Sequence, residues 1–361
     1  MNIEVTKDLW SYLSGTKKPI LMYGMGNGAD KILHVCENYG IQIADFFASD
    51  GFVRGHSFHS KTVLSYSQAK EKYTDFIVLL SFASSLPDVI ENIKRIATEV
   101  ELYAPDVPVF GDNLFNMEFF NTHRAELEKA YELLSDERSK EVYTNVINYK
   151  LSGKIEYLFA SDDDEATVTA EFIRPNEVKR YVDLGAYNGD TIRSLMSCAK
   201  ELAEVIAFEP DRRNFRKLSK FAETVEKPKI SAYKLGAWSH ADKLAFDSSG
   251  NRNANLNASS GTNLTEVSVD SVDNIAKNFS PDYIKYDVEG SEYEALIGSR
   301  ETITAHSPRL LVSLYHRSED LYKLPLLIKE LYPEYSLYLR KLRYIPAWDL
   351  NLYAINEESR K

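Results

Sequence analysis

Apolar and polar positions alternate along the first part of the chain in a way that predicts strands separated by helices. Short apolar runs lie at residues 19–23, 41–48, 76–81 and 107–110, and the segments between them have helical spacing. Such runs are typical of buried strands, and strands that alternate with helices favour a parallel sheet covered on both faces. Residues 1–112 are therefore predicted to form a small Rossmann-like α/β domain.

A longer alternation of the same kind extends over residues 166–361. Its strand-like runs are expected at 180–184, 205–208, 229–235, 283–286, 310–314, 335–339 and 350–355. A short connection separates the last two runs, which indicates an antiparallel hairpin at one end of the sheet. We predict a seven-stranded Rossmann-like sheet whose last strand is antiparallel, with an added β-ribbon at 243–246 and 265–269.

Residues 113–165 are predicted to form a helical linker that packs the two α/β domains together. Apolar residues recur at helical spacing from Leu127 to Leu134, and Ser135-Asp136-Glu137 indicates a break followed by a new N-cap. The acidic run Asp162-Asp163-Asp164-Glu165 follows. Because four consecutive carboxylates cannot all face one ion, we expect this run to be a solvated linker.

Composition and charge narrow the classes of partner. The chain has 361 residues and a net charge of −11, and we find no strong local basic patch, so nucleic acid is not expected. No apolar run approaches the roughly 20 residues of a membrane span, and no secretory signal is evident, so we expect a cytoplasmic protein without membrane insertion. Cys36 and Cys198 fall in predicted helices and are expected to be buried free thiols. A small hydroxylated or glycan-like ligand fits this composition. A homodimer is compatible with it, although no heptad run is present.

The first domain contains a glycine-rich turn, Gly24-Met25-Gly26-Asn27-Gly28-Ala29, between a strand and a helix. Its spacing matches a dinucleotide-binding fingerprint, and Asp50 follows at about the distance of a ribose-binding acid. The alternative is that the glycines only turn the strand sharply into the helix.

The second domain has a different turn at the corresponding place. After the strand ending in Asp183-Leu184 come Gly185-Ala186-Tyr187-Asn188-Gly189, and Asp190-Thr191 open a helix expected to reach about Ala203. The Gly-x-x-x-Gly spacing differs from that of nicotinamide enzymes. It suits S-adenosylmethionine, which has no pyrophosphate: Asp183 can face its ammonium group. Glu209, followed by Pro210 at the end of the second strand, can accept from both ribose hydroxyls. The alternatives are a loop-stabilising Asp183 and a helix-capping Glu209.

Further candidates lie at the ends of later strands, where ligands bind in open α/β sheets. Gly236-Ala237-Trp238 could border the adenine, and Asp287, Glu289 and His316 follow two of the buried runs. The polar loop 248–262 between the two ribbon strands is interpreted as a substrate lid.

Several of these segments together resemble the FkbM family of methyltransferases, from about Arg180 to Ile355. The matching pieces are Val182-Asp183-Leu184-Gly185-Ala186-Tyr187-Asn188-Gly189-Asp190-Thr191, Ala207-Phe208-Glu209-Pro210, Val269-Asp270, Ile284-Lys285-Tyr286-Asp287-Val288-Glu289-Gly290-Ser291-Glu292 and Leu314-Tyr315-His316. The resemblance implies a class I methyltransferase fold and methyl transfer from S-adenosylmethionine to a hydroxyl oxygen, often on a sugar or a natural product. One departure is Tyr315, where the family often has a glutamate.

An alcohol that attacks a methyl group loses its proton, so a base is expected near the acceptor. His316 is the first candidate because imidazole titrates near neutral pH, and Glu289 is the second. Asp287 is expected to orient the cofactor or a substrate hydroxyl. No metal is predicted, although Asp287, Glu289 and Asp270 could instead hold a divalent ion.

Two other classes of function stay open from the sequence. One is an NAD(P)-dependent oxidoreductase that uses Gly24 to Asp50. The other is a non-catalytic protein that binds a nucleotide or sugar nucleotide.

Overall fold

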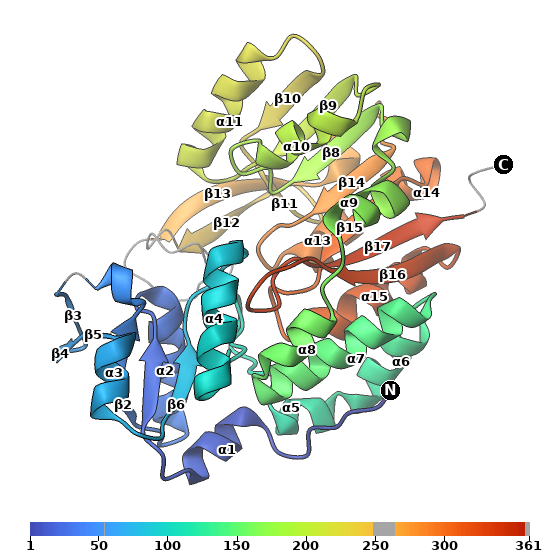
Figure 1. The fold of residues 1–361 in the computed structure, drawn as a ribbon. Helices are drawn as coiled ribbons and strands as arrows, with labels where there is room; N and C mark the ends of the chain where they lie inside the picture. The colour runs from blue at the N-terminus through green and yellow to red at the C-terminus, as the bar shows by residue number, and fades with distance from the viewer. Residues whose placement is uncertain (54, 248–263, 358–361) are drawn as a thin grey trace.

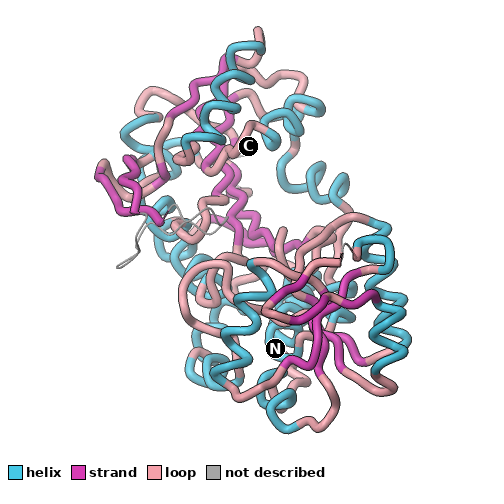
Figure 2. The backbone as a smooth tube through the Cα atoms, turned by 90° about the vertical axis from the view of Figure 1, so that its left-hand side faces the viewer, coloured by secondary structure: helices cyan, strands magenta, loops and turns pink. Residues whose placement is uncertain are grey.

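The computed structural model describes residues 1–53, 55–247 and 264–357 and contains two separate parallel-type sheets (Figures 1 and 2). The N-terminal sheet has the strand order β5-β2-β1-β6-β7, and all its neighbours are parallel. Its strands are β1 (Ile20–Tyr23), β2 (Ile43–Ala48), β5 (Leu64–Ser65), β6 (Ile77–Leu80) and β7 (Glu101–Tyr103). The helices α1 (Leu9–Gly15), α2 (Asn27–Asn38), α3 (Tyr66–Lys72) and α4 (Pro87–Glu99) accompany it. A short η1 (Asp50–Phe52) and the hairpin β3 (Ser57–Phe58) and β4 (Lys61–Thr62) complete this part.

The prediction of a strand at 107–110 is wrong. The last strand of this sheet is β7, which pairs with β6 over Glu101–Tyr103. Proline lacks the N–H group that a sheet ladder needs, and Pro108 interrupts the later segment. The carbonyl groups of Pro108 and Val109 accept from Lys31 Nζ instead, at 3.1 and 2.8 Å.

The C-terminal sheet has the order β10-β9-β8-β14-β15-β17-β16. Six of its strands run in the same direction, and β17 runs in the opposite one. Its strands are β8 (Arg180–Leu184), β9 (Glu204–Phe208), β10 (Lys229–Tyr233), β14 (Tyr283–Tyr286), β15 (Arg309–Ser313), β16 (Tyr335–Lys341) and β17 (Leu350–Asn356). The predicted seven-stranded sheet with a reversed last strand is confirmed. The predicted ribbon is present as β12 (Asp242–Asp247) and β13 (Leu264–Asp270), joined by the short β11 (Gly236–Ala237). The interpretation of 248–262 as a lid falls outside the described residues.

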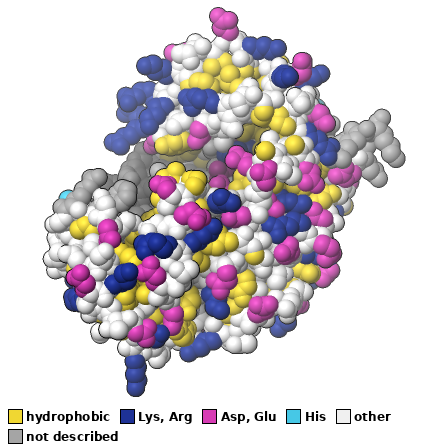
Figure 3. Space-filling model, in the orientation of Figure 1, with side chains coloured by type: hydrophobic (Ala, Val, Ile, Leu, Met, Phe, Trp, Pro, Cys, Tyr) yellow, Lys and Arg dark blue, Asp and Glu magenta, His cyan; other side chains and the backbone are white. Residues whose placement is uncertain are grey.

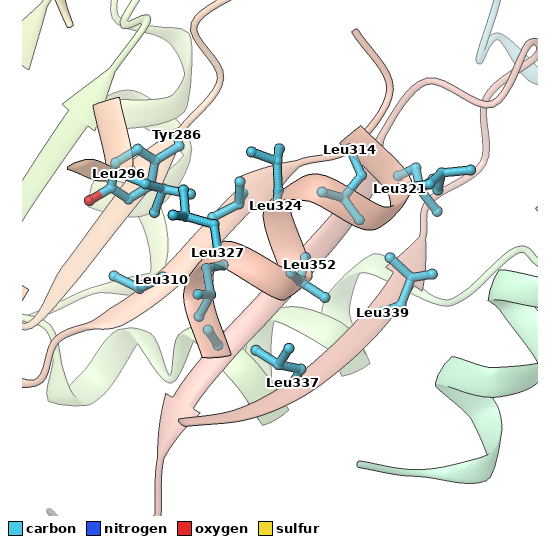
Figure 4. Close-up of a cluster of buried hydrophobic side chains, with 14 of the residues drawn as sticks. Tyr286, Leu296, Leu310, Leu314, Leu321, Leu324, Leu327, Leu337, Leu339 and Leu352 are labelled. Atoms are coloured by element: carbon cyan, nitrogen blue, oxygen red, sulfur yellow. The ribbon is translucent and has the colours of Figure 1, made fainter. Parts of the chain in front are cut away.

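Helices cover both faces of this sheet. They are α10 (Asp190–Cys198), α11 (Arg212–Thr224), α12 (Val272–Ile275), α13 (Glu292–Ile297), α14 (Arg300–His306) and α15 (Asp320–Leu331). Figure 4 shows leucines of α15, among them Leu324 and Leu327, facing Leu310 and Leu352 of the sheet. All four are buried in one apolar cluster that continues into the helical middle of the chain.

The middle of the chain is helical, as predicted, and contacts both cores. It comprises α5 (Met117–Thr122), α6 (Arg124–Glu132), α7 (Glu137–Ser152), α8 (Ile155–Ala160), α9 (Glu165–Val168), η2 (Thr169–Ile173) and η3 (Pro175–Glu177). Asp136 is the N-cap of α7 and accepts from the Ser139 N–H at 2.8 Å, as the sequence predicted. Val146 and Ile147 of α7 belong to the C-terminal core, whereas Tyr149 belongs to the N-terminal core. One helix therefore supplies side chains to both.

Two further expectations are corrected by the structure. The acidic run is not simply solvated, because Asp162 pairs with the buried Lys341 at 2.6 Å and Asp163 with Arg138 at 2.9 Å. Helix α10 ends at Cys198 rather than near Ala203. Cys36 is buried as expected, but Cys198 is exposed, since it lies on the outer side of that last turn.

The two α/β parts are also joined by main-chain hydrogen bonds. Ser84 and Ile345 exchange a pair at 2.9 and 3.0 Å, and the Phe110 N–H donates to the His316 carbonyl at 2.9 Å. The loop between β16 and β17 thus reaches the first sheet. Within the described ranges, every helix falls short of the length or apolarity needed to cross a bilayer.

Replacing Ile147 by Ala is expected to lower the free energy of unfolding by about 2–5 kcal/mol. The fully buried side chain fills space where α7 meets the C-terminal core, and its removal leaves a cavity. Chemical denaturation followed by circular dichroism measures the change. Ile297→Ala is the matched control, since that side chain is 36% exposed and should cost about 1 kcal/mol or less. Equal losses in the two variants would contradict a structural role for this contact.

Candidate functional site

The candidate site lies where β8, β14 and β15 end side by side at the carboxyl edge of the C-terminal sheet. Strand β8 is central, with β9 on one side and β14 on the other, so the strand order reverses beside it. Loops that leave the sheet in opposite directions open a crevice at such a point, where ligands of open α/β sheets bind. Asp183, Asp287 and His316 all lie on or directly after these strands.

The turn after β8 is held in a conformation that only glycine adopts without strain. Gly185 has φ +83°, and a Cβ there would overlap the Asp287 carbonyl oxygen. Gly189 has φ +85° and forms the N-cap of α10. Close packing of the turn against the end of β14 therefore requires Gly185, whether or not a ligand is bound.

Asp183 is fully buried beneath this turn. One carboxylate oxygen accepts from the Thr191 hydroxyl at 2.5 Å, and the other, Oδ1, has no hydrogen-bond partner among the described residues. Burial raises the pKa of Asp183, and the charge of Lys285, 3.6 Å from Oδ1, opposes that rise. A buried carboxylate oxygen without a donor is costly, so it is a natural place for a cationic or hydrogen-bonding ligand group.

Lys285 is a buried cation between two carboxylates that the sequence analysis did not select. Its ammonium group lies 3.2 Å from Asp287 and 3.6 Å from Asp183. Burial would lower the pKa of Lys285, but the two carboxylates outweigh it and hold that pKa above its ordinary value. The signal in the sequence was a lysine inside the otherwise apolar strand β14.

Glu209 ends β9 and is almost completely buried. Its carboxylate accepts from the Tyr187 N–H and from the Asp211 N–H, both at 2.8 Å. Burial, with smaller contributions from the charges of Asp211 and Asp183, raises the pKa of Glu209 to about 7, although the two backbone donors oppose the rise. Each carboxylate oxygen still has a free lone pair, so the backbone contacts orient the group without preventing it from accepting ligand hydroxyls.

The other predicted cofactor residues surround this turn or lie in the ribbon. Tyr187 is 43% exposed, Asn188 accepts from Arg193, and Asp190 accepts from the Thr191 N–H. Pro210 follows Glu209 directly. Gly236 and Ala237 form β11, and the Trp238 N–H donates to the Asp270 carbonyl at 2.9 Å, so these three belong to the ribbon sheet.

Asp287, Glu289 and His316 are brought together, as predicted. His316 Nε2 lies 3.5 Å from Asp287 and 3.6 Å from Glu289. The Tyr315 hydroxyl donates to Asp287 at 2.8 Å, which gives this departure from the family pattern a structural role. Glu289 has φ +56°, a left-handed conformation that costs about 1–3 kcal/mol for a residue other than glycine.

Glu292 is a second residue that the sequence analysis did not select. It is 1% exposed, and its Oε1 lies 2.9 Å from His316 Nδ1, a close ionic contact rather than an aligned hydrogen bond. The same oxygen accepts from the Val288 N–H at 2.8 Å. Glu292 follows Asp287 by five residues and begins α13. An acid at this position, close behind the end of β14, was the sequence signal that could have identified it.

The acidic groups around His316 have very different protonation behaviour. Burial would raise the pKa of Asp287, but Lys285, His316 and Tyr315 bring it to about 2. Burial raises the pKa of Glu289 to about 7, and His316 only partly opposes this. Burial would lower the pKa of His316, but Glu292, Asp287 and Glu289 raise it to about 10. Near neutral pH the imidazole is therefore a cation, and Glu289 is the group poised to titrate.

The alternative metal set predicted from the sequence, Asp287, Glu289 and Asp270, is not the set whose ligand atoms cluster in the structure. Asp270 accepts from the Ser271 N–H and from the side-chain amide of Asn274, so its carboxylate is engaged at the start of α12, where Ser271 is the N-cap. Among the described residues, Asp287, Glu292 and His316 offer ligand atoms within 4.8 Å of one another. Lys285 and the His316 cation already supply positive charge to this group.

The glycine-rich turn of the N-terminal domain has a structural explanation. A Cβ at Gly24 would contact Phe82 and Ser81, and one at Gly28 would overlap the Ser81 carbonyl oxygen. Asp50 accepts from the backbone N–H and the hydroxyl of Ser67, at 3.1 and 2.8 Å. No observation among the described residues favours a dinucleotide over this packing role.

Comparison with known proteins shows what the part of the chain that carries the site is similar to. Residues 183–346 match the model of the methyltransferase FkbM domain. A methyltransferase FkbM from Methylobacillus flagellatus KT has a similar fold, with a TM-score of 0.71 and 21% identity over 94% of this chain and 91% of that one. A fibrillarin from Aeropyrum pernix in complex with S-adenosyl-L-methionine is far less similar, with a TM-score of 0.33 and 13% identity over 49% of this chain and 66% of that one. No curated protein matches the chain.

Replacing Gly185 by Ala is expected to destabilise the protein by about 1–3 kcal/mol or more, because of its positive φ and the overlap with Asp287. Thermal denaturation measures this loss. Gly51→Ala is the matched control: Gly51 has open space around its Cβ position and no positive φ. Wild-type melting of Gly185→Ala would show that the turn is not packed as described.

Proposed function

Because residues 183–346 match the model of the methyltransferase FkbM domain, we propose that this protein transfers a methyl group from S-adenosylmethionine to a hydroxyl oxygen. The acceptor that we propose is a sugar, a glycan or a natural product. A net charge of −11 on the protein favours an uncharged hydroxylated acceptor over a strongly anionic one. The flanking parts, residues 1–112 and 113–165, are proposed as a supporting α/β domain and the linker that attaches it.

The observation that carries the proposal is the pair of buried acids at the ends of adjacent central strands. Asp183 has an oxygen without a donor, and Glu209 is oriented by two backbone N–H groups. The free oxygen of Asp183 can accept from the ammonium group of the cofactor's amino-acid part. The carboxylate of Glu209 can accept from the two hydroxyls of its ribose. Bound S-adenosylmethionine would supply an electrophilic methyl group that its own sulfonium charge activates.

The protein's own contribution is to position the acceptor oxygen and to remove its proton. Positioning alone can supply a large part of the acceleration when attack is in line. We propose Glu289 as the base, ahead of His316. Glu289 is half exposed and has a pKa of about 7, whereas His316 is 1% exposed and has a pKa of about 10. A group with a pKa near the working pH is the most effective base.

His316 and Glu292 then act behind Glu289. The imidazolium of His316 contacts both Asp287 and Glu289, and Glu292 holds it from the opposite ring nitrogen. This fixed cation orients the base and limits the rise of its pKa. Asp287 stays ionised with a pKa of about 2 and is proposed to orient the cofactor or a substrate hydroxyl.

The N-terminal domain supplies one side of the acceptor region. Phe110 donates its N–H to the His316 carbonyl, and its ring lies 5.9 Å from the imidazole. The charge of Glu289 acts on Lys31 of α2, whose pKa burial lowers. We propose that an acceptor placed at Glu289 also meets this wall.

The cofactor assignment is tested by calorimetric titration with S-adenosylmethionine and, separately, with NAD. Glu209→Ala is expected to weaken S-adenosylmethionine binding at least tenfold, about 1.4 kcal/mol. The control is Glu201→Ala, an exposed glutamate of the same domain. Binding of NAD without binding of S-adenosylmethionine would overturn the proposal.

The base assignment is tested by the pH dependence of kcat/KM with an acceptor found by screening hydroxylated sugars. Glu289 is protonated below its pKa, so activity should rise as the pH passes through about 7. Glu289→Gln should lower kcat by about 10²–10⁴-fold and abolish the rise of activity near pH 7, while S-adenosylmethionine still binds. The exposed Glu301→Gln should leave the profile unchanged. A profile that survives in Glu289→Gln would assign the base elsewhere.

A further inference from the structure

A strongly basic surface lies on α11 and the strand that follows it, outside the proposed site. Between residues 212 and 234 the chain carries eight lysines and arginines and only two acidic residues. This segment has a charge of +6, whereas the rest of the chain amounts to −17. The expectation of no local basic patch is therefore wrong, because the overall negative charge concealed a concentrated positive segment.

The fold aligns these charges on one side of the molecule. Arg212, Arg213, Arg216, Lys217 and Lys220 recur at three- and four-residue spacing on α11, and all five are exposed. Lys227, Lys229 and Lys234 continue the surface along β10, the edge strand on which α11 packs. We call these eight residues the basic strip; Figure 3 shows Lys and Arg side chains gathered over this region. From Arg212 to Lys220 the helix rises about 12 Å.

The positive charges of the basic strip are not neutralised within the protein. Elsewhere in the chain, lysines and arginines form ion pairs, such as Lys70 with Glu99 and Arg95 with the same glutamate. None of the eight side chains forms an ion pair with any other residue that the structure describes. The like charges of such a cluster repel one another, so binding of an anionic partner to the cluster is favoured.

The apolar side of α11 packs against the core of its own domain. Leu218 is fully buried, and Phe215 and Phe221 pack against the core below β9 and β10. The helix therefore cannot insert an apolar face into a bilayer, and its aromatic rings cannot stack on bases. Base-specific recognition of nucleic acid uses elements that enter a groove or rows of exposed aromatic rings. α11 presents neither, and the exposed ring beside the strip, that of Tyr187, already lies under Lys217. An anionic membrane surface, in contrast, attracts clustered lysines and arginines through their charge, without groove geometry or stacking.

We propose that the basic strip docks the protein onto a membrane surface that carries anionic lipid headgroups. The contact is electrostatic and peripheral. The remaining negative charge of the chain does not prevent it, because charges farther than about 8 Å from the membrane are screened at physiological salt. The strip begins beside Glu209, since Asp211, the N-cap of α11, donates its N–H to that carboxylate at 2.8 Å. Docking would thus hold the cofactor end of the sheet close to the lipid surface. This inference does not depend on the methyl acceptor.

The experiment is sedimentation of the full chain with vesicles of phosphatidylcholine alone or of two parts phosphatidylcholine and one part phosphatidylserine. Binding to the anionic vesicles is expected to exceed binding to the neutral ones at least about tenfold and to fall steeply as salt is raised. Arg213→Gln/Arg216→Gln/Lys220→Gln should reduce it at least about tenfold.

The matched control, Lys17→Gln/Lys129→Gln/Lys277→Gln, makes the same change in net charge at exposed positions outside the strip and should bind as wild type does. Thermal melting and S-adenosylmethionine titration of both variants separate loss of docking from loss of fold or cofactor. No binding to anionic vesicles, or equal losses in the two triple variants, overturns the proposal. Tight binding of a single-stranded oligonucleotide that displaces the vesicles and depends on the strip would also overturn it, in favour of nucleic acid.

Discussion

The buried ammonium group of Lys285 is the contact on which the candidate site depends. It lies between Asp183 and Asp287, which come from the ends of different strands and would otherwise place two negative charges together with no cation between them. Removing one partner of such a group leaves an uncompensated buried charge, which typically costs about 3–5 kcal/mol. The lysine therefore permits two acids at the centre of one sheet edge, and the turn at Gly185 can then close against Asp287.

Around this cation, the carboxylates differ because their surroundings differ. Asp287 has Lys285, His316 and the Tyr315 hydroxyl close by and stays ionised. Glu289, two residues later, stands on a left-handed turn beyond the reach of Lys285 as an ion-pair partner and is close to half-protonated at neutral pH. Two similar side chains thus have separate chemistry, one as a permanent anion and one as a group able to take up a proton.

Much of this could be predicted from the sequence where the signal is local. The apolar runs predicted all seven strands of the C-terminal sheet but only β1, β2 and β6 of the N-terminal one, since the short β5 and β7 have no such run. The glycine turn and the acids that follow it predicted the edge of the sheet at which the candidate site lies. Contacts between distant segments were harder to foresee. Glu292 is important because it contacts His316, and the structure was needed to show that the basic residues of α11 and β10 are exposed and unpaired among the described residues. The order of His316 and Glu289 as bases also changed, because an imidazole surrounded by three carboxylates no longer titrates near neutral pH.

The paired hydrogen bonds between Ser84 and Ile345, together with the bond from Phe110 to His316, have a mechanical consequence. A domain that is attached at both a loop tip and a catalytic strand end cannot swing on a single hinge, since rotation about either attachment breaks the other. We infer that the first domain is held in a fixed position beside His316 and that this position is set when the chain folds. Acceptors of different size would have to be accommodated by side chains and loops, and shape selection would be built into the resting enzyme.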